Sequence, residues 1–426
     1  MITECRTRRT GRLLVSAAFI TSLGNNVQLI SGALLVIRHH HTMLSVGWLF
    51  IAVAIPQALL SPFFGRLADR VDRRKLWIFS DVASAVTALA LPVWLWFGHG
   101  GGAGPAVYVA NLALAVLAAL FFPASAALVK ERTPPERLRG FNAHYEMATQ
   151  AGMLLSATVG GLAVQLFGAV PLLLVNAGTF AVSAVCVTAV GRGREGGAGV
   201  STTTEDAAMP PVHDAGAPVT PRLPMAWLVV LFAQGSVVVT VFNALLPKFV
   251  LGVSHRGAAT FGAIDALGSL GFLLATGAYR ISGRRFGDLW TAVAGFLLCS
   301  VLFALQPHFG VAGAALLVPC GAFVFGQARI ASRNLLMATA GLDRAGRVFG
   351  LANGGGLAAT VVVMLLVAVI TDRFGAGYGF AATAVLSATA TAAAGHHLFR
   401  ARARMRDRGH GAARQVRERP VGEVLP

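Results

Sequence analysis

Four ionisable side chains lie within long apolar stretches of the sequence, where the chain offers them few polar neighbours. These residues are Asp81, Glu146, Asp265 and Arg329. A charged side chain at the centre of a bilayer costs about 2.5–3.5 kcal/mol by insertion scales, so each one needs a partner, water or a bound molecule. A carboxyl group in such a place can carry a proton, and a guanidinium can hold a carboxylate. The alternative for each residue is a structural hydrogen bond between helices.

Glu146 and Arg329 are expected to meet. At the rise of an α-helix, Glu146 lies about 9 Å and Arg329 about 13 Å from the same side of the membrane, whereas Asp265 enters about 12 Å from the opposite side. Arg333 shares a helix face with Arg329 and is close enough to the membrane surface to extend its guanidinium there. We therefore predict a pair or a shared water between Glu146 and Arg329, with Glu146 as the better proton carrier.

Asp81 lies only about five residues into its apolar stretch. Arg73 and Arg74 precede that stretch and offer it partners. Asp81 is therefore either a further coupling residue or the structural partner of this basic loop.

Two apolar stretches carry polar side chains at positions i, i+4 and i+7, a spacing that places them on one helix face. The first set is Thr21, Asn25 and Gln28, and the second is Ser236, Thr240 and Asn243. Such stripes can face a polar cavity. They can equally form hydrogen bonds between helices, which contribute about 0.6 kcal/mol each.

The composition indicates a membrane protein that crosses the bilayer many times. Hydrophobic residues make up 55% of the 426 residues and charged residues 12%, about half of the ~25% that is usual in soluble domains. Long apolar runs separated by short polar breaks predict twelve transmembrane helices, because lipid offers the backbone no hydrogen-bond partners. We place them at 13–37, 44–65, 76–98, 105–129, 141–167, 169–190, 225–250, 257–280, 287–306, 310–338, 347–371 and 376–399.

The net charge of +17 follows from topology and does not require a nucleic acid. Arginine and lysine cluster in every second loop and in both chain ends, and such residues prefer the cytoplasmic side. The sequence therefore predicts a multi-pass protein of the cell membrane with both termini in the cytoplasm. The Arg-rich segment after residue 399 is expected to contact anionic lipid.

The chain divides into two related halves. Residues 191–223 are rich in Gly, Ala, Thr and Pro and cannot bury a core, so they predict a flexible linker. The predicted organisation is a six-helix half at 1–190, this linker, a six-helix half at 224–399 and a basic tail at 400–426. Arginine motifs after spans two and eight, and before spans five and eleven, recur at nearly the same offset, which favours a parallel duplication.

The loop after the second span carries a recognisable motif. Gly65-Arg66-Leu67-Ala68-Asp69-Arg70-Val71-Asp72-Arg73-Arg74-Lys75 resembles the loop 2–3 signature of the major facilitator superfamily, with Asp72 replacing a glycine. Thr21 to Asn26 and Ser80-Asp81 resemble the branch of drug exporters that includes macrolide and enterobactin exporters. The resemblance covers the whole chain and implies an all-α protein of two pseudo-symmetric halves.

The resemblance also implies roles for particular residues. In that family the signature acts as a conformational gate, here Gly65, Asp69, Arg70, Arg73 and Arg74. Asp69 would meet the positive N-terminus of span eleven, near Arg347. Spans one, four, seven and ten line the central cavity in this fold, so the two polar stripes would contact substrate together with Tyr108 and Asn111.

We therefore expect a secondary transporter that exports a small, largely apolar molecule, such as an antibiotic, drug or siderophore-like metabolite, by proton antiport with alternating access. The alternatives are an importer or proton symporter of the same fold, a membrane-embedded enzyme and a sensor that does not transport. No phosphate-binding loop motif is present, and the ionisable residues are too scattered for an enzyme site. The substrate and the coupling ion stay open.

We expect no cofactor and no metal site. The run His39-His40-His41 has no carboxylate nearby, and the four cysteines form neither a disulfide framework nor a metal-binding pattern. The expected partners are the small-molecule substrate, protons and the lipid bilayer, with the protein as a monomer.

Overall fold

Helices account for almost all of the structure. The computed structural model describes residues 9–25, 43–97, 103–167, 169–190, 223–253 and 258–418, and it contains no strand within them. A first helix takes up residues 9–25. It is followed by α2 (Met43–Arg70), α3 (Arg73–Trp96), α4 (Ala103–Arg132), α5 (Pro135–Phe167), α6 (Ala169–Ala189), α7 (Met225–Pro247), α8 (Ala258–Arg285), α9 (Asp288–Leu305), α10 (Gly310–Thr339), α11 (Ala345–Phe374) and α12 (Ala376–Glu418).

These elements confirm the predicted all-α fold with twelve helices, the first helix plus the eleven from α2 to α12. Seven stretches of the described chain are long and apolar enough to cross a membrane, and one of them runs through both α9 and α10. Three short elements complete the chain: the π-helix η2 (Lys248–Val253) and the 3₁₀ turns η3 (Gln306–Phe309) and η4 (Leu342–Arg344).

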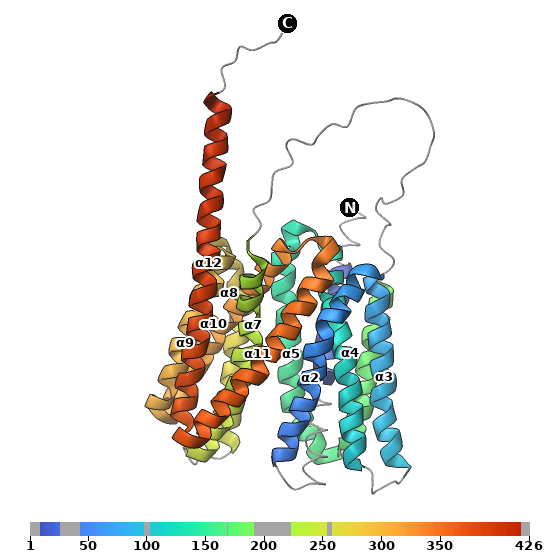
Figure 1. Cartoon of the computed structure of the whole chain (residues 1–426). Helices are drawn as coiled ribbons and strands as arrows, with labels where there is room; N and C mark the ends of the chain where they lie inside the picture. The colour runs from blue at the N-terminus through green and yellow to red at the C-terminus, as the bar shows by residue number, and fades with distance from the viewer. Residues whose placement is uncertain are drawn as a thin grey trace, which may run out of the picture.

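The helices form two sets. In the first set α3 packs against α4 and α6, and α2 packs against α4. In the second set α10 packs against α8 and α9, α7 against α11, and α9 against α12. The two sets stand side by side, blue to green and yellow to red (Figure 1). Of the predicted linker between them at 191–223, residues 191–222 lie outside the described residues.

The two sets meet at one end of the bundle, which we call the linker end. It is the end where α6 finishes at Ala189 and α7 begins at Met225. The largest contact between the sets there is that of α2 with α11. Gly346, Gly350 and Gly354 follow one face of α11 at every fourth residue and lie against the backbone of α2. A Cβ at Gly65 would lie 2.5 Å from the carbonyl oxygen of Gly346, so only glycine permits this approach.

Several helices extend beyond the predicted apolar spans at the linker end. The second span was predicted to finish at residue 65, yet α2 continues to Arg70. Asp72 then begins α3, since its carboxylate accepts hydrogen bonds from the backbone N–H groups of Arg74 and Lys75 at 2.9 and 3.2 Å. A carboxylate at this position satisfies donors that the helix leaves unpaired. The aspartate that replaces a glycine of the loop signature is therefore a helix cap.

The predicted end of the last helix at residue 399 is wrong. α12 continues through the basic segment to Glu418, and it extends beyond the other labelled helices as a single red helix (Figure 1). Arginine and alanine favour the helix, so the change from apolar to basic residues marks the edge of the membrane rather than the end of the helix.

The close approach of α2 and α11 predicts the effect of adding a methyl group between them. Gly350→Ala should favour conformations in which the linker end is open, because the added Cβ would overlap with the carbonyl oxygen of Ser61. Overpacking of this kind costs about 1–3 kcal/mol. The measurement is the distance between spin labels at the exposed positions Glu136 on α5 and Arg284 on α8. Gly355→Ala is the matched control, because a Cβ there would meet nothing within 4 Å. Equal distances in the two variants would contradict this view of the contact.

Candidate functional site

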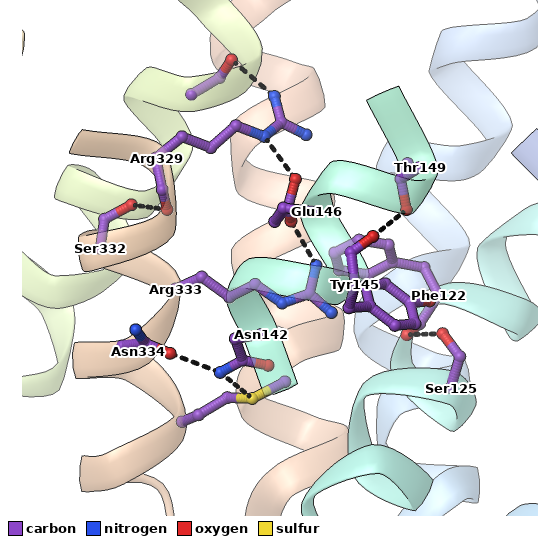
Figure 2. Close-up of polar contacts among 12 residues, drawn as sticks. Phe122, Ser125, Asn142, Tyr145, Glu146, Thr149, Arg329, Ser332, Arg333 and Asn334 are labelled. Atoms are coloured by element: carbon purple, nitrogen blue, oxygen red, sulfur yellow. Dashed lines mark hydrogen bonds and ion pairs between the residues drawn. The ribbon is translucent and has the colours of Figure 1, made fainter. Parts of the chain in front are cut away.

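A buried carboxylate on α5 lies between two arginines of α10. Arg333 Nη1 donates to Glu146 Oε1 at 2.6 Å, and Arg329 Nε donates to Glu146 Oε2 at 3.2 Å. Figure 2 shows both guanidinium groups pointing from α10 toward the carboxylate. Because α5 and α10 belong to different sets of helices, these ion pairs join the two halves. The predicted contact between Glu146 and Arg329 is thus present.

The depth of the pair follows from helix geometry. Glu146 is eleven residues beyond the start of α5 and Arg329 is ten residues before the end of α10. At the rise of an α-helix both positions lie roughly 15 Å from the linker end. The two helices run in opposite directions, so side chains at matching depths face each other. Counting residues along the sequence was sufficient to predict that Glu146 and Arg329 share a depth.

The interpretation of Arg333 was wrong. We expected its guanidinium to extend to the membrane surface, but its side chain is only 6% exposed and is the closer of the two partners of Glu146. Its guanidinium carbon also lies 4.6 Å from the centre of the Tyr145 ring, where a cation is attracted by the face of the ring. Depth along a helix did not reveal that a neighbouring helix offers a carboxylate and an aromatic ring.

The three charged side chains differ in exposure. Arg329 is 25% exposed, whereas Glu146 is 3% exposed. Arg329 Nη1 also donates to the carbonyl oxygen of Gly235 on α7 at 3.2 Å. Arg329 is therefore the accessible member of the cluster, on the side away from the linker end, and Arg333 covers the carboxylate on the linker side.

The electrostatics of this cluster strongly favour keeping it together. Removing one partner from a buried ion pair typically lowers the free energy of unfolding by about 3–5 kcal/mol, because the remaining charge stays buried without a partner. This loss is comparable to the whole stability of a marginally stable protein. Adding a proton to Glu146 would have a similar effect, since it removes the negative charge that both guanidinium groups share. The cluster can thus couple a protonation event to the separation of α5 from α10.

A further chain of polar contacts continues from the cluster toward the linker end. Asn142 Nδ2 donates to Asn334 Oδ1 at 2.6 Å, and Asn334 Nδ2 donates to the Tyr279 hydroxyl at 2.8 Å. That hydroxyl donates to Asp288 at 2.6 Å, and Asp288 also accepts from Arg139 at 2.9 Å. The sequence analysis missed these residues. No spacing within one helix could have identified them, because the partners come from α5, α8, α9 and α10.

The loop signature forms a second contact between the halves. Asp69 Oδ1 accepts from the backbone N–H of Gly346 at 2.7 Å, and Asp69 Oδ2 accepts from that of Arg347 at 2.9 Å. These N–H groups belong to the first turn of α11, where a negative charge is stabilised by the helix dipole. The expected position of Asp69 at the start of span eleven is therefore correct.

The basic residues Arg70, Arg73 and Arg74 of the signature lie in different surroundings. Arg73 donates to Glu131 at 3.2 Å and to the carbonyl oxygen of Leu342 at 2.5 Å, so it also joins the two halves. Arg74 donates to the carbonyl oxygens of Val187 and Thr188 at the end of α6. Arg70 is exposed at the end of α2.

Lys130 of α4 adds a further contact between the two halves at the linker end. Its ammonium group donates to the carbonyl oxygens of Met337 and Ala340 at the end of α10. A cation is favourable at the C-terminus of a helix, so Asp69 and Lys130 contact opposite poles of two helices in the other half.

The other two acids lie away from the cluster. Asp81 is buried and accepts a hydrogen bond at 2.6 Å from Ser183 on α6. The predicted alternative, a contact with Arg73 or Arg74, is wrong, because the carboxylate points to Ser183 of α6 while both arginines donate to other groups. Asp265 is half-buried on α8, beside Ile264, which packs in the same cluster as Val318 of α10. Val318 is about 16 Å along α10 from Arg329, so Asp265 does not contact that arginine here.

The polar stripes differ in burial. Thr21 and Asn111 are buried, Tyr108, Ser236 and Thr240 are half-buried, and Asn25 and Asn243 are exposed. Asn111 Nδ2 donates to the carbonyl oxygen of Val107 in its own helix. Gln28 lies outside the described residues. That these side chains line one cavity stays a prediction.

The histidine run at 39–41 also lies outside the described residues. Within the described part of the chain, no three His, Cys, Asp or Glu side chains are grouped so that they could hold a metal ion.

Comparison with known proteins agrees with this architecture. The model of the Major Facilitator Superfamily matches residues 14–359. The multidrug efflux pump Tap of Mycolicibacterium fortuitum is 26% identical in an alignment of 379 residues that covers 85% of this chain and 89% of that protein.

Two solved structures have the same fold. The crystal structure of a bacterial homologue of the iron transporter ferroportin, in an outward-facing state, superposes with a TM-score of 0.69 at 16% identity and covers 92% of this chain and 99% of that one. The human organic anion transporter MFSD10 gives a TM-score of 0.71 at 14% identity, with 90% of this chain and 98% of that chain covered. At these identities the likeness concerns the fold alone.

The contact of Asp69 with α11 predicts the effect of removing its charge. Asp69→Asn should favour an open linker end, because the amide loses the charge that interacts with the first turn of α11. The effect should be about 0.3–2 kcal/mol in the balance between closed and open states. It is measured with the same spin labels at Glu136 and Arg284. The control is Asp372→Asn, an exposed acid near the opposite end of α11 that pairs with Lys248 within the same half. A response of the control as large as that of Asp69→Asn would contradict a specific contact.

Proposed function

The chain belongs to the Major Facilitator Superfamily and is thus a membrane transporter, and we propose that it exports a small, largely apolar molecule in exchange for protons. The proposed substrate classes are antibiotics, drugs and siderophore-like metabolites. Export is supported by relatives that are named multidrug efflux pumps. The observation that carries the proton coupling is the buried Glu146, held between Arg329 and Arg333 across the two halves.

The proposed orientation places the linker end in the cytoplasm. Arg66, Arg70 and Arg74 at this end agree with the preference of basic residues for the cytoplasmic side. The contacts of α2 with α11 and of α5 with α10 then close the cytoplasmic side. This conformation corresponds to a transporter open to the outside.

The proposed coupling step begins with a proton from outside. Arg329 is the exposed member of the cluster on the side away from the linker end, so a proton approaching from that side can reach Glu146 beside it. Protonation removes the negative charge, weakens both ion pairs and leaves two guanidinium groups that repel each other. Separation of α5 from α10 is then favoured, and the linker end opens.

The cycle closes with release of the proton to the cytoplasm. Once the linker end is open, water reaches Glu146 and the carboxyl group can lose its proton. Substrate enters from the cytoplasmic side, and the ionised carboxylate again attracts Arg329 and Arg333. The halves close over the substrate and open on the opposite side, which is alternating access by rocking of two repeats.

In this scheme the loop signature stabilises the closed state without carrying the proton. Asp69 contacts the start of α11, and Arg73 contacts Leu342 just before it. We expect Asp69→Asn to lower transport while leaving membrane insertion intact. The polar stripes at Thr21, Asn25 and Gln28 and at Ser236, Thr240 and Asn243, with Tyr108 and Asn111, remain the proposed lining of the substrate cavity.

The proposed role of Glu146 predicts which mode of transport its substitution removes. Purified protein in proteoliposomes is tested with a drug chosen because cells that express the transporter resist it. Glu146→Gln should abolish accumulation driven by a pH gradient, because a glutamine cannot alternate between charged and neutral forms. It should leave exchange of labelled for unlabelled drug, since exchange needs no net movement of protons. Both modes are measured on the same preparation.

The matched control is Asp265→Asn, which removes the half-buried acid of α8. It should retain accumulation driven by the pH gradient. If Glu146→Gln also concentrates the drug, Glu146 does not carry the proton. If the drug accumulates only with protons moving in the same direction, the protein is a symporter and the exchange of drug for protons is wrong.

A further inference from the structure

A cleft of about 1070 Å³ lies at the linker end between α12 and the start of α9. It is separate from the charged cluster and from the loop signature. Its walls are formed by Phe286, Trp290, Phe399, Arg402, Ala403, Met405, Arg406 and Asp407. The first three are aromatic and lie where the apolar part of α12 ends. The others belong to the basic extension of α12, so the cleft is apolar at one end and charged at the other.

The apolar end of the cleft is an exposed aromatic surface. The rings of Trp290 and Phe399 lie 4.7 Å apart. Trp290 is 56% exposed and Phe286 is 60% exposed. Leu298 and Val301, further along α9, are also exposed and share its outer face with Trp290 at helical spacing. The aromatic surface therefore continues into the exposed outer face of α9.

The charged end lies directly beyond these rings. Arg402 and Arg406 are three and seven residues after Phe399, so they share its helix face. Ala403, on the same face, has a small side chain and leaves space between them. Asp407 is the one acid that lines the cleft, so its walls carry one positive charge in excess. A third arginine, Arg285, lies with its guanidinium carbon 5.7 Å from the centre of the Phe286 ring.

We propose that this cleft binds an anionic phospholipid. The acyl chains lie along Trp290 and the outer face of α9, and the headgroup phosphate lies between Arg402 and Arg406. The order of groups along the cleft is that of a lipid, with apolar surface at membrane depth, aromatic rings at the interface and guanidinium groups beyond it. Arginine binds phosphate through paired N–H donors. A soluble anion would use the arginines alone and would leave the aromatic surface uncovered.

The bound lipid has a structural consequence for the basic extension. The end of α12 projects away from the bundle (Figure 1), and residues 402–403 and 405–407 of this extension line the cleft together with Phe286 and Trp290. A lipid that bridges α9 and α12 would fix the extension against the bundle. The excess of positive charge favours phosphatidylglycerol over a zwitterionic lipid. This inference depends on the membrane placement of the chain and not on the direction of transport.

The test is lipid binding to the full-length protein. Detergent-purified protein is titrated with phosphatidylglycerol or phosphatidylcholine, and bound lipid is counted by native mass spectrometry. Arg402→Gln should weaken phosphatidylglycerol binding about fivefold, the factor that corresponds to ~1 kcal/mol for one arginine at an anionic surface. Ala403→Leu, which fills the cleft without changing the charge, should weaken it as well. Phosphatidylcholine should bind more weakly than phosphatidylglycerol to the unmodified protein.

Arg404→Gln is the matched control. Arg404 is exposed, carries the same charge and lies about 140° around the helix from Phe399, so its removal should leave phosphatidylglycerol binding unchanged. An equal loss in Arg404→Gln and Arg402→Gln would mean diffuse attraction to a basic helix and would overturn the site. Unchanged binding in Ala403→Leu, or equal binding of the two lipids, would overturn it too.

Discussion

The low polarity of the membrane interior makes a single buried carboxylate decisive for this structure. Glu146 is almost fully buried and has two arginines within hydrogen-bond distance. In water such contacts contribute little, but inside a bilayer a charge without a partner is expensive. Both partners are on the other half of the protein, so the ionised carboxylate joins α5 to α10 through two ion pairs. The proposed exchange of substrate for protons depends on this constraint.

The remaining contacts at the linker end use weaker forces to support the same closed arrangement. Asp69 interacts with the dipole of α11, and the glycines at 346, 350 and 354 allow the backbones of α2 and α11 to approach closely. These contacts do not involve Glu146. We infer that they set the baseline stability of the closed state, while Glu146 makes that stability responsive to pH.

Much of this arrangement was predictable because two simple rules apply within lipid. Apolar runs must be helices, and the rise per residue places Glu146 and Arg329 at matching depths. The contact of Asp69 followed from a resemblance to a known signature.

Arg333 and the chain from Asn142 to Asp288 could not be predicted, because their partners are set by helix rotation and by contacts between distant segments. The glycines of α11 have a visible four-residue spacing, which is typical of closely packed membrane helices, and that signal was overlooked. The continuation of α12 was missed because a hydropathy pattern marks the membrane boundary and not the end of a helix.

The central claim, that ionised Glu146 keeps the linker end closed, is tested most directly by measuring the distance between spin labels at Glu136 and Arg284 as a function of pH. In the unmodified protein the account predicts a short distance at alkaline pH and a growing population of longer distances as the pH falls. In Glu146→Gln the longer distances should be present at every pH. A short distance that persists in Glu146→Gln, or a pH response that this variant retains, would contradict the account.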